Sequence, residues 1–224
     1  MAIIFCLNSI PQREENLKKI VPTILNQADK FYVNLVNYDH TPKVLTGNPK
    51  FVVNHLKNAG SEIRFLYYND IGPEDYYFTI DDDIRYPHNY ASVLIKNVEK
   101  YNHKALCSVH GTILDLKQDR NFYGSTRSGY NYKRPLAENA QVMLPGCGTL
   151  CISKRSGFKI NMDDFKVKNM SDAYIGAWAH KQGIPVYAIA RKKRWLKMLP
   201  QKGNSIWGNN PYKEVDKIIN ECFK

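Results

Sequence analysis

Residues 76–83 have the sequence YYFTIDDD. Tyr76 to Ile80 are nearly all β-formers, and an unbroken run of this kind is typical of a strand buried on both faces of a parallel sheet. Three carboxylates, Asp81 to Asp83, follow directly. Because like charges this close repel and raise one another's pKa, we expect a positive group beside them.

The acidic cluster has the composition of a metal site. On an extended chain Asp81 and Asp83 point to one side and Asp82 to the other, so the first and third can share a cation. Carboxylate oxygens suit Mg²⁺ or Mn²⁺, which would also neutralise a diphosphate. Ligands of open α/β sheets bind at the carboxyl ends of the strands, where this cluster is expected to lie. The alternative is an acidic turn that caps the following helix.

Short β-rich runs alternate with helical segments along the chain, which is typical of βα units. We therefore predict an α/β fold with a Rossmann-like, mostly parallel central sheet flanked by helices. Ser171 is the expected N-cap of the last helix. Strands are expected at 2–8, 31–38, 62–67, 76–80, 105–110, 142–152 and 184–190, helices at 15–26, 48–58, 87–101 and 172–182, and a long loop or irregular hairpin at 119–134.

The composition is that of a globular protein. The 224 residues, 43% apolar and 24% charged, fit one domain. We find no run near the roughly 20 apolar residues that span a bilayer, and the apolar residues 1–7 lack the basic start of a signal peptide. Five cysteines without a metal-like CxxC pair indicate a reducing cytoplasm, with Cys6 and Cys107 buried in strands.

The formal net charge of +11 is a clear bias. A basic surface attracts nucleotide phosphates, nucleic acid or anionic lipid head groups, and charge alone does not choose among them. The densest basic run is at 191–194, close to Lys197 and Lys202. Both a solvated basic face and a phosphate-binding segment fit this run.

Residues 77–84, YFTIDDDI, resemble the DxD region of GT-A-fold glycosyltransferases, especially the family 2-like enzymes of bacteria or phage. The resemblance extends over most of the chain. Residues 9–13 resemble the segment that opens the nucleotide pocket in those enzymes. Asp39, after the second strand, resembles the acidic residue that holds the base or ribose.

The resemblance implies a role for each of these residues. Asp81 and Asp83 would be the metal ligands for Mn²⁺ or Mg²⁺, and Asp81 or Asp82 would face the ribose or a bridging water. In the family the metal bridges the two phosphates and stabilises the departing nucleoside diphosphate. The nucleotide-binding residues implied in this way are Ser9, Pro11, Arg13, Asp39, Asp81 and Asp82.

Residues 169–174 resemble the late helix start at which the family places its catalytic base. The resemblance makes Asp172 that base, with its carboxylate held by backbone N–H groups and aimed into the cleft. Ser171 stands where a glutamate often precedes the aspartate. The alternative role of Asp172 is plain capping of the helix.

Residues 146–149 resemble the small-residue strand end that lets the backbone approach the donor sugar and the acceptor. The alternative is a bulge or tight turn. The sugar-contacting residues expected from the resemblance are His110, Gly146, Cys147, Gly148 and Trp195.

The tail, residues 191–224, is expected to form a basic lid over the diphosphate, as in related enzymes. Arg191, Lys193 and Arg194 are candidate phosphate clamps and Trp195 a candidate stacking wall, and residues 204–207 would continue the lid. The rest of the single domain would divide into a nucleotide-sugar-binding half, 1–110, and an acceptor half, 111–190.

The sequence thus predicts a metal-dependent glycosyltransferase that moves a sugar from a nucleoside diphosphate donor, UDP-linked, to a hydroxyl group with inversion. The sequence does not decide between two classes of acceptor. One is a polysaccharide or lipid-linked glycan, with the basic face resting on the anionic inner membrane surface. The other is a nucleic acid, such as hydroxylated bases of phage DNA.

Two other classes remain as alternatives. A nucleotidyltransferase also holds Mg²⁺ with paired aspartates, but no Gly-rich phosphate loop follows the first strand. A basic nucleic-acid-binding module explains the charge and leaves the three aspartates unexplained.

Overall fold

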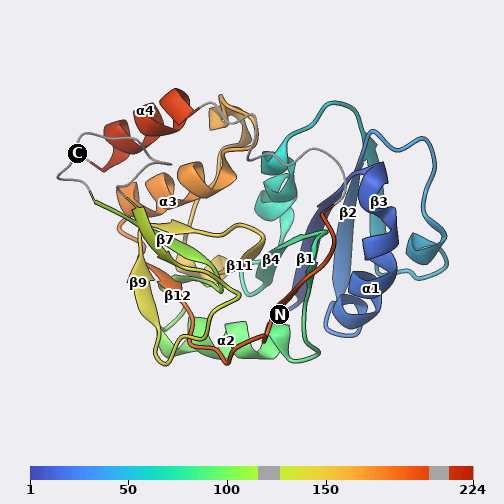
Figure 1. The fold of residues 1–224 in the computed structure, drawn as a ribbon, viewed down its shortest axis with the longest axis horizontal. Coiled ribbons are helices and arrows are strands. Elements are labelled where there is room, and N and C mark those ends of the chain that lie inside the picture. The colour runs from blue at the N-terminus through green and yellow to red at the C-terminus, as the bar shows by residue number, and fades with distance from the viewer. Residues whose placement is uncertain (116–126, 202–211, 224) are drawn as a thin grey trace.

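The computed structural model describes residues 1–115, 127–201 and 212–223. Its main element is an eight-stranded sheet in the order β3-β2-β1-β4-β11-β6-β12-β9 (Figure 1). Six of these strands run parallel to one another, and β11 and β9 run against them. The bounds are β3 Phe51–Leu56, β2 Lys30–Val36, β1 Ile3–Ser9, β4 Tyr76–Asp81, β11 Thr149–Ser153, β6 Leu106–Ser108, β12 Val186–Ala188 and β9 Ala140–Val142.

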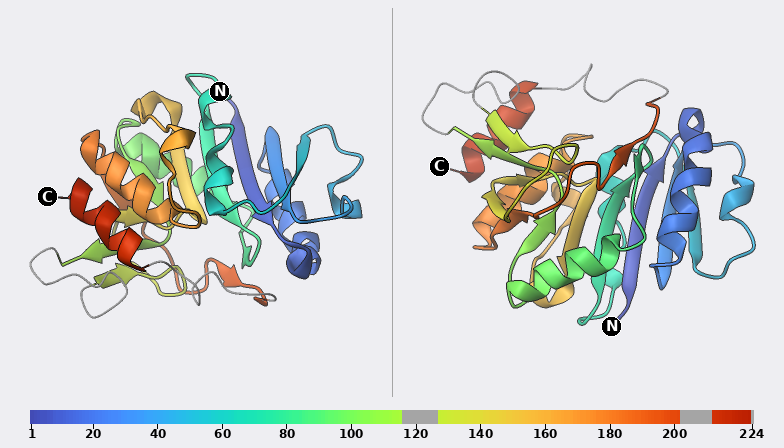
Figure 2. Two further views of the ribbon diagram at one scale, coloured as in Figure 1. Left: turned by 90° about the horizontal axis from the view of Figure 1, so that it is seen from above. Right: turned by 60° about the horizontal axis from the view of Figure 1, so that its bottom comes forward.

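Two small sheets border the main one (Figure 2). One joins β10 (Leu144–Pro145), β7 (Gly111–Leu114) and β8 (Arg127–Tyr130). The other pairs β5 (Ile84–Arg85) with β13 (Lys197–Met198), so the chain returns late to the acidic cluster.

Helices cover both faces of the main sheet. Neighbouring residues of a strand point to opposite faces, so each face has its own core. Phe5 packs with α1 (Glu14–Leu25) and α2 (Tyr90–Lys100). Cys6 packs on the other face, in the core that also holds residues of α3 (Ser171–Lys181). Helix α4 (Tyr212–Cys222) contacts α3. The short 3-10 helices are η1 Pro11–Arg13, η2 Lys43–Leu45, η3 Ser61–Phe65, η4 Tyr68–Asp70, η5 Lys154–Ser156 and η6 Met162–Asp164.

These layers confirm the predicted α/β class with a mostly parallel sheet, and Cys6 and Cys107 are buried in strands as expected. None of the helices in the described ranges combines the length and the apolar composition of a bilayer-crossing segment.

Two predicted elements between the second strand and the acidic strand are wrong. Residues 48–58 contain the edge strand β3 and not a helix, since its Phe-Val-Val start favours pairing with β2. Residues 62–67 are not a strand, because η3 occupies most of that range and packs over the sheet.

Further differences concern the late part of the chain. Met170, and not Ser171, is the N-cap of α3, and Ser171 is its first helical residue. The sequence also gave no indication of α4. Residues 204–207, the expected continuation of a lid, lie outside the described residues, as does the first half, 119–126, of the loop expected at 119–134.

Candidate active site

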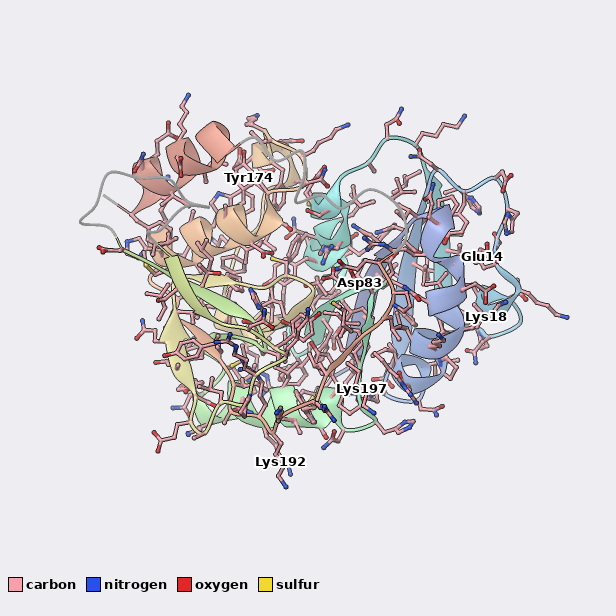
Figure 3. The ribbon with its side chains drawn as sticks, in the orientation of Figure 1. Glu14, Lys18, Asp83, Tyr174, Lys192 and Lys197 are labelled. Atoms are coloured by element: carbon pink, nitrogen blue, oxygen red, sulfur yellow. The ribbon has the colours of Figure 1, made fainter. Side chains whose placement is uncertain are left out.

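Two cavities open where β1, β2 and β4 end at the same edge of the sheet. The larger cavity measures about 470 Å³ and the smaller about 300 Å³. Asp83 lies between the part of the molecule that carries α1 and the part that carries α3 (Figure 3). The residues that line both cavities are Ser61, Arg64, Asp81, Asp83, Asn169 and Gln201.

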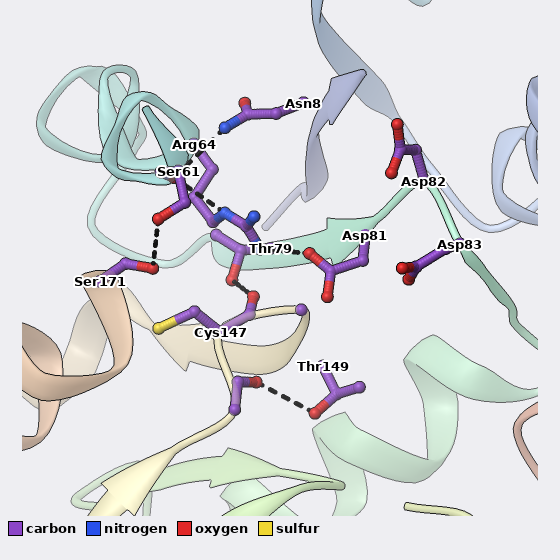
Figure 4. A network of polar contacts seen from close by, with 12 residues as sticks. Asn8, Ser61, Arg64, Thr79, Asp81, Asp82, Asp83, Cys147, Thr149 and Ser171 are labelled. Carbon is purple, nitrogen blue, oxygen red and sulfur yellow. Dashed lines mark hydrogen bonds and ion pairs between the residues drawn. The ribbon is translucent and has the colours of Figure 1, made fainter. Parts of the chain in front are cut away.

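The acidic cluster has the positive partners that its charge requires. Arg64 Nη1 lies 2.7 Å from Asp81 Oδ1 (Figure 4). Arg13 Nη1 lies 2.6 Å from Asp82 Oδ1 and 3.4 Å from Asp83 Oδ2. Two arginines thus face three carboxylates, and each arginine also lines the smaller cavity.

Asp82 and Asp83 are buried enough to change how they ionise. Burial raises the pKa of Asp82 to about 6, although Arg13 opposes the shift. Burial and the charge of Asp81 also raise the pKa of Asp83. Both shifts indicate that the cluster would be stabilised by additional positive charge.

The carboxylates of the acidic cluster provide part of a ligand set for a divalent cation. Within the described ranges, no group of three His, Cys, Asp or Glu side chains is arranged to hold a metal ion by itself. Asp81 and Asp83 nevertheless both line the larger cavity. Two carboxylates on a cavity wall are the set that Mg²⁺ commonly uses together with substrate phosphates and waters.

Arg64 is a central site residue that sequence reasoning missed. It lies in η3, is only 7% exposed, and its Nε donates to the carbonyl of Ser61 at 2.9 Å. Burial lowers the pKa of Arg64, but the charge of Asp81, the hydrogen bond to Asp81 and the other negative groups nearby together outweigh this effect, so the pKa is raised and the guanidinium stays charged. Nothing in the local sequence distinguishes this arginine from a surface cation.

Asp172 lies in the first turn of α3 and lines the larger cavity. Its Oδ1 accepts a hydrogen bond of 2.9 Å from the backbone N–H of Cys147, so the carboxylate is held across the cavity wall. The carboxylate is solvent-accessible through the cavity, yet the surrounding walls desolvate it and raise its pKa. The bonds from Cys147 and the charges of His110 and Arg64 oppose that rise.

The turn at 146–148 lies directly against the acidic strand. The hydroxyl of Thr79 donates to the Cys147 carbonyl at 2.5 Å, and that of Tyr86 donates to the Gly148 carbonyl at 2.6 Å. The Tyr86 hydroxyl also accepts a bond of 2.8 Å from the N–H of Asp81. A Cβ on Gly148 would overlap the Asp81 carboxylate, so any larger residue here would displace that side chain.

Other predicted sugar contacts are placed differently. Gly146, Gly148 and His110 line the larger cavity, with the His110 ring 6.3 Å from that of Tyr132. Cys147 contributes its N–H, while its side chain is buried. Lys133 lines the same wall and was not predicted.

The smaller cavity collects part of the expected nucleotide-binding set. Ser9 and Arg13 line it, and Ser9 Oγ lies 3.0 Å from the hydroxyl of Tyr38. Pro11 starts η1 beside it but is not in its lining. Asp39 lies outside the cavity, fully exposed and paired with His40 at 2.6 Å, because the chain turns away after Val36. Asn37, in a left-handed conformation (φ 60°), occupies the wall instead.

The expected clamps at 191–195 do not reach either cavity. Arg191 is buried and donates to the carbonyls of Ile189, Asn131 and Arg134. These hydrogen bonds give it a structural role inside the fold. Trp195 Nε1 lies 3.3 Å from Asn89 Oδ1, and its ring packs on that of Tyr90.

Arg194 forms an exposed left-handed turn (φ 62°), and neighbouring Lys192 extends outward (Figure 3). The tail reaches the cavities farther on. Gln201 Nε2 donates to Asp83 Oδ2 at 2.9 Å, and Met198 lines the larger cavity.

No family model matches the chain, and no curated protein matches its sequence. Among solved structures, it is similar to residues 1–349 of S. aureus TarS in complex with UDP-GlcNAc, with a TM-score of 0.59 and 13% identity over 98% of this chain and 65% of that chain. A longer S. aureus TarS structure has a TM-score of 0.51 and 9% identity over 100% and 43% of the two chains.

The chain therefore spans less than two thirds of the length of these structures. At this identity the similarity concerns the fold alone. The fold is the GT-A-like one of the TarS glycosyltransferase structures, and the comparison does not single out the family 2-like enzymes.

Proposed function

We propose that the chain is a glycosyltransferase that moves a sugar from a UDP-linked donor to a hydroxyl group. The observation that carries the proposal is the meeting of two cavities at Asp81, Asp83 and Arg64. A nucleoside in the smaller cavity and a sugar in the larger one would place the diphosphate at that boundary. The similarity to a structure that contains UDP-GlcNAc supports this choice of donor.

The residues at the boundary suit a diphosphate. Arg13 and Arg64 supply fixed positive charge, and the arginine fork matches phosphate oxygens. Asp81 and Asp83 would hold Mn²⁺ or Mg²⁺, which when bound supplies charge stabilisation to the departing nucleoside diphosphate. Arg64 would keep Asp81 in place, because their ion pair is partly buried and directional.

Asp172 is the proposed base. Its carboxylate takes the proton of the acceptor hydroxyl, the oxygen attacks the anomeric carbon, and the bond from that carbon to the phosphate oxygen breaks as UDP leaves. A single displacement of this kind inverts the anomeric configuration. The N–H of Cys147 keeps the carboxylate aimed into the cavity.

The acceptor would enter past Tyr132 and Lys133, which line the larger cavity and not the smaller one. We propose a glycan as acceptor, free or lipid-linked. We also propose that the chain forms one domain, because β4 and β11, from the two expected halves, pair directly.

The donor site can be tested by thermal shift. UDP and UDP-GlcNAc with Mn²⁺ are expected to raise the unfolding midpoint, while GDP and ADP give smaller shifts. Saturation at 100 times Kd adds about 2.7 kcal/mol to the free energy of unfolding. Asp83→Asn is expected to lose the metal-dependent part of the shift, and the exposed control Asp164→Asn to keep it. Stabilisation by duplex DNA with none by nucleotides would replace the proposal with a basic nucleic-acid-binding module.

The pH dependence of kcat tests Asp172. A base acts when ionised, so kcat is expected to fall as the pH drops through the pKa of Asp172. Because that pKa is raised, the fall should begin above the range of an ordinary aspartate, about 3.9. His110→Gln removes a charge that opposes the rise and should move the acid limb to still higher pH. An acid limb that stays in place in this variant would argue against the assignment.

A further inference from the structure

Asparagines occupy one row of the main sheet at its carboxyl edge. Asn54 of β3 pairs in register with Asn34 of β2, Asn34 with Asn8 of β1, and Asn8 with Asp81 of β4. Side chains in register on parallel strands share a face of the sheet. The row of three asparagines therefore leads, strand by strand, to the acidic cluster.

Asn34 is the buried centre of this row, with no exposed surface. Its Nδ2 lies 3.0 Å from Asn8 Oδ1 and 3.3 Å from the Ile63 carbonyl, and its Oδ1 accepts a bond of 3.1 Å from the Tyr67 hydroxyl. A buried amide is costly unless its hydrogen bonds are made. Here Ile63 belongs to η3 and Tyr67 follows it, so the amide holds this segment against the sheet.

Helix η3 depends on such contacts, because a single 3-10 turn is weak by itself. The Ser61 carbonyl accepts from Asn8 Nδ2 at 3.2 Å. The Arg64 carbonyl accepts from the Tyr77 hydroxyl at 2.8 Å. With the bond from Asn34 to Ile63, three carbonyls of one turn are each held by a side chain from a different strand of the sheet.

Arg64 is the functional side chain on this turn. Its Nε donates to the same Ser61 carbonyl that Asn8 holds, and its Nη1 reaches Asp81 (Figure 4). The position of the guanidinium along the acidic strand is thus set by where η3 sits. Asn34 itself lines neither cavity.

We propose that Asn34 is a positioning residue for Arg64. Its amide fixes η3 on the sheet so that the Arg64 guanidinium bonds Asp81 and faces the boundary of the two cavities. The effect on nucleotide binding rests on the proposed function, whereas the effect on Arg64 does not.

The first measurement is hydrogen exchange of the Arg64 Nε–H by NMR in Asn34→Leu, a variant of similar volume without the amide. We expect at least tenfold faster exchange than in the native chain. Asn54→Leu is the matched control, because the buried Nδ2 of Asn54 has no hydrogen-bond partner among the described residues, and it should leave exchange unchanged. Native exchange in Asn34→Leu overturns the proposal.

Tyr67→Phe is the milder second variant, since it removes one hydrogen bond to Asn34 and keeps the ring. If Asn34→Leu does not fold, the same exchange measurement on Tyr67→Phe tests the proposal. Faster exchange of the Arg64 Nε–H supports the proposal, and unchanged exchange overturns it.

The second measurement is a double-mutant cycle on the Kd for UDP with Mn²⁺. Asn34→Leu should weaken binding by at least tenfold in the native chain and by less than twofold in an Arg64→Ala background, because it acts through Arg64. Equal losses in both backgrounds overturn the proposal. If the native chain binds no nucleoside diphosphate, the proposed function fails, while the exchange measurement still decides the role of Asn34.

Discussion

Replacing Asp172 with asparagine is expected to lower kcat for sugar transfer by about 10²- to 10⁴-fold, the usual contribution of a general base. The Kd for UDP should stay within about twofold of the native value, since Asp172 lines the larger cavity only. Single-turnover transfer and nucleotide binding, measured on the same preparation, separate the two effects.

Asparagine is the informative replacement because its amide oxygen can still accept the bond from the Cys147 N–H. The turn at 146–148 then keeps its support, and the change removes only the ability to take a proton. The exposed Asp164→Asn on η6 is the matched control and should retain native kcat. An Asp172→Asn variant that keeps kcat within about threefold would leave Asp172 with a structural role alone.

The acidic strand and its neighbours could be predicted because their signals are local. Residues 76–80 are dense in β-formers, and the carboxylates after them mark the edge where β1 and β2 also end. Asp172 could be placed at a helix start for the same reason. Parallel pairing then brings these distant segments to the two cavities without further information.

Arg64 could not be predicted because its role depends on tertiary placement. The sequence from 48 to 67 contains a strand and a short 3-10 helix, the reverse of the expected helix and strand. An arginine in an expected strand gives no reason to pair with Asp81, 17 residues later. The row of asparagines that holds η3 exists only once three strands are in register.

Two residues that were expected to bind the nucleotide lie outside the cavities for a related reason. Asp39 and Arg191 both follow strands, but the position after a strand does not determine which way the chain turns. Asp39 turns to solvent beside His40, and the Arg191 guanidinium is used by three carbonyls inside the fold. Gln201, ten residues beyond Arg191, reaches the acidic cluster because β13 pairs with β5.

Replacing Gly148 with alanine is expected to weaken UDP binding with Mn²⁺ by about tenfold to a hundredfold, because an added methyl group in a packed site costs about 1 to 3 kcal/mol. The added Cβ would overlap the Asp81 carboxylate, which is held on its other side by Arg64. Gly148 does not have a positive φ, so the backbone itself tolerates alanine. Titration calorimetry with UDP and Mn²⁺ measures the loss.

Gly157→Ala is the control that separates this clash from a general loss of stability. Gly157 has a φ of 73° and open space around its Cβ, so alanine there strains the backbone by about 1 kcal/mol without touching the cavities. It should lower the unfolding midpoint and leave the Kd for UDP unchanged. Gly148→Ala should instead change the Kd more than the midpoint, because Asp81 can move into the cavity. Native UDP affinity in Gly148→Ala would mean that the position of Asp81 does not determine donor binding.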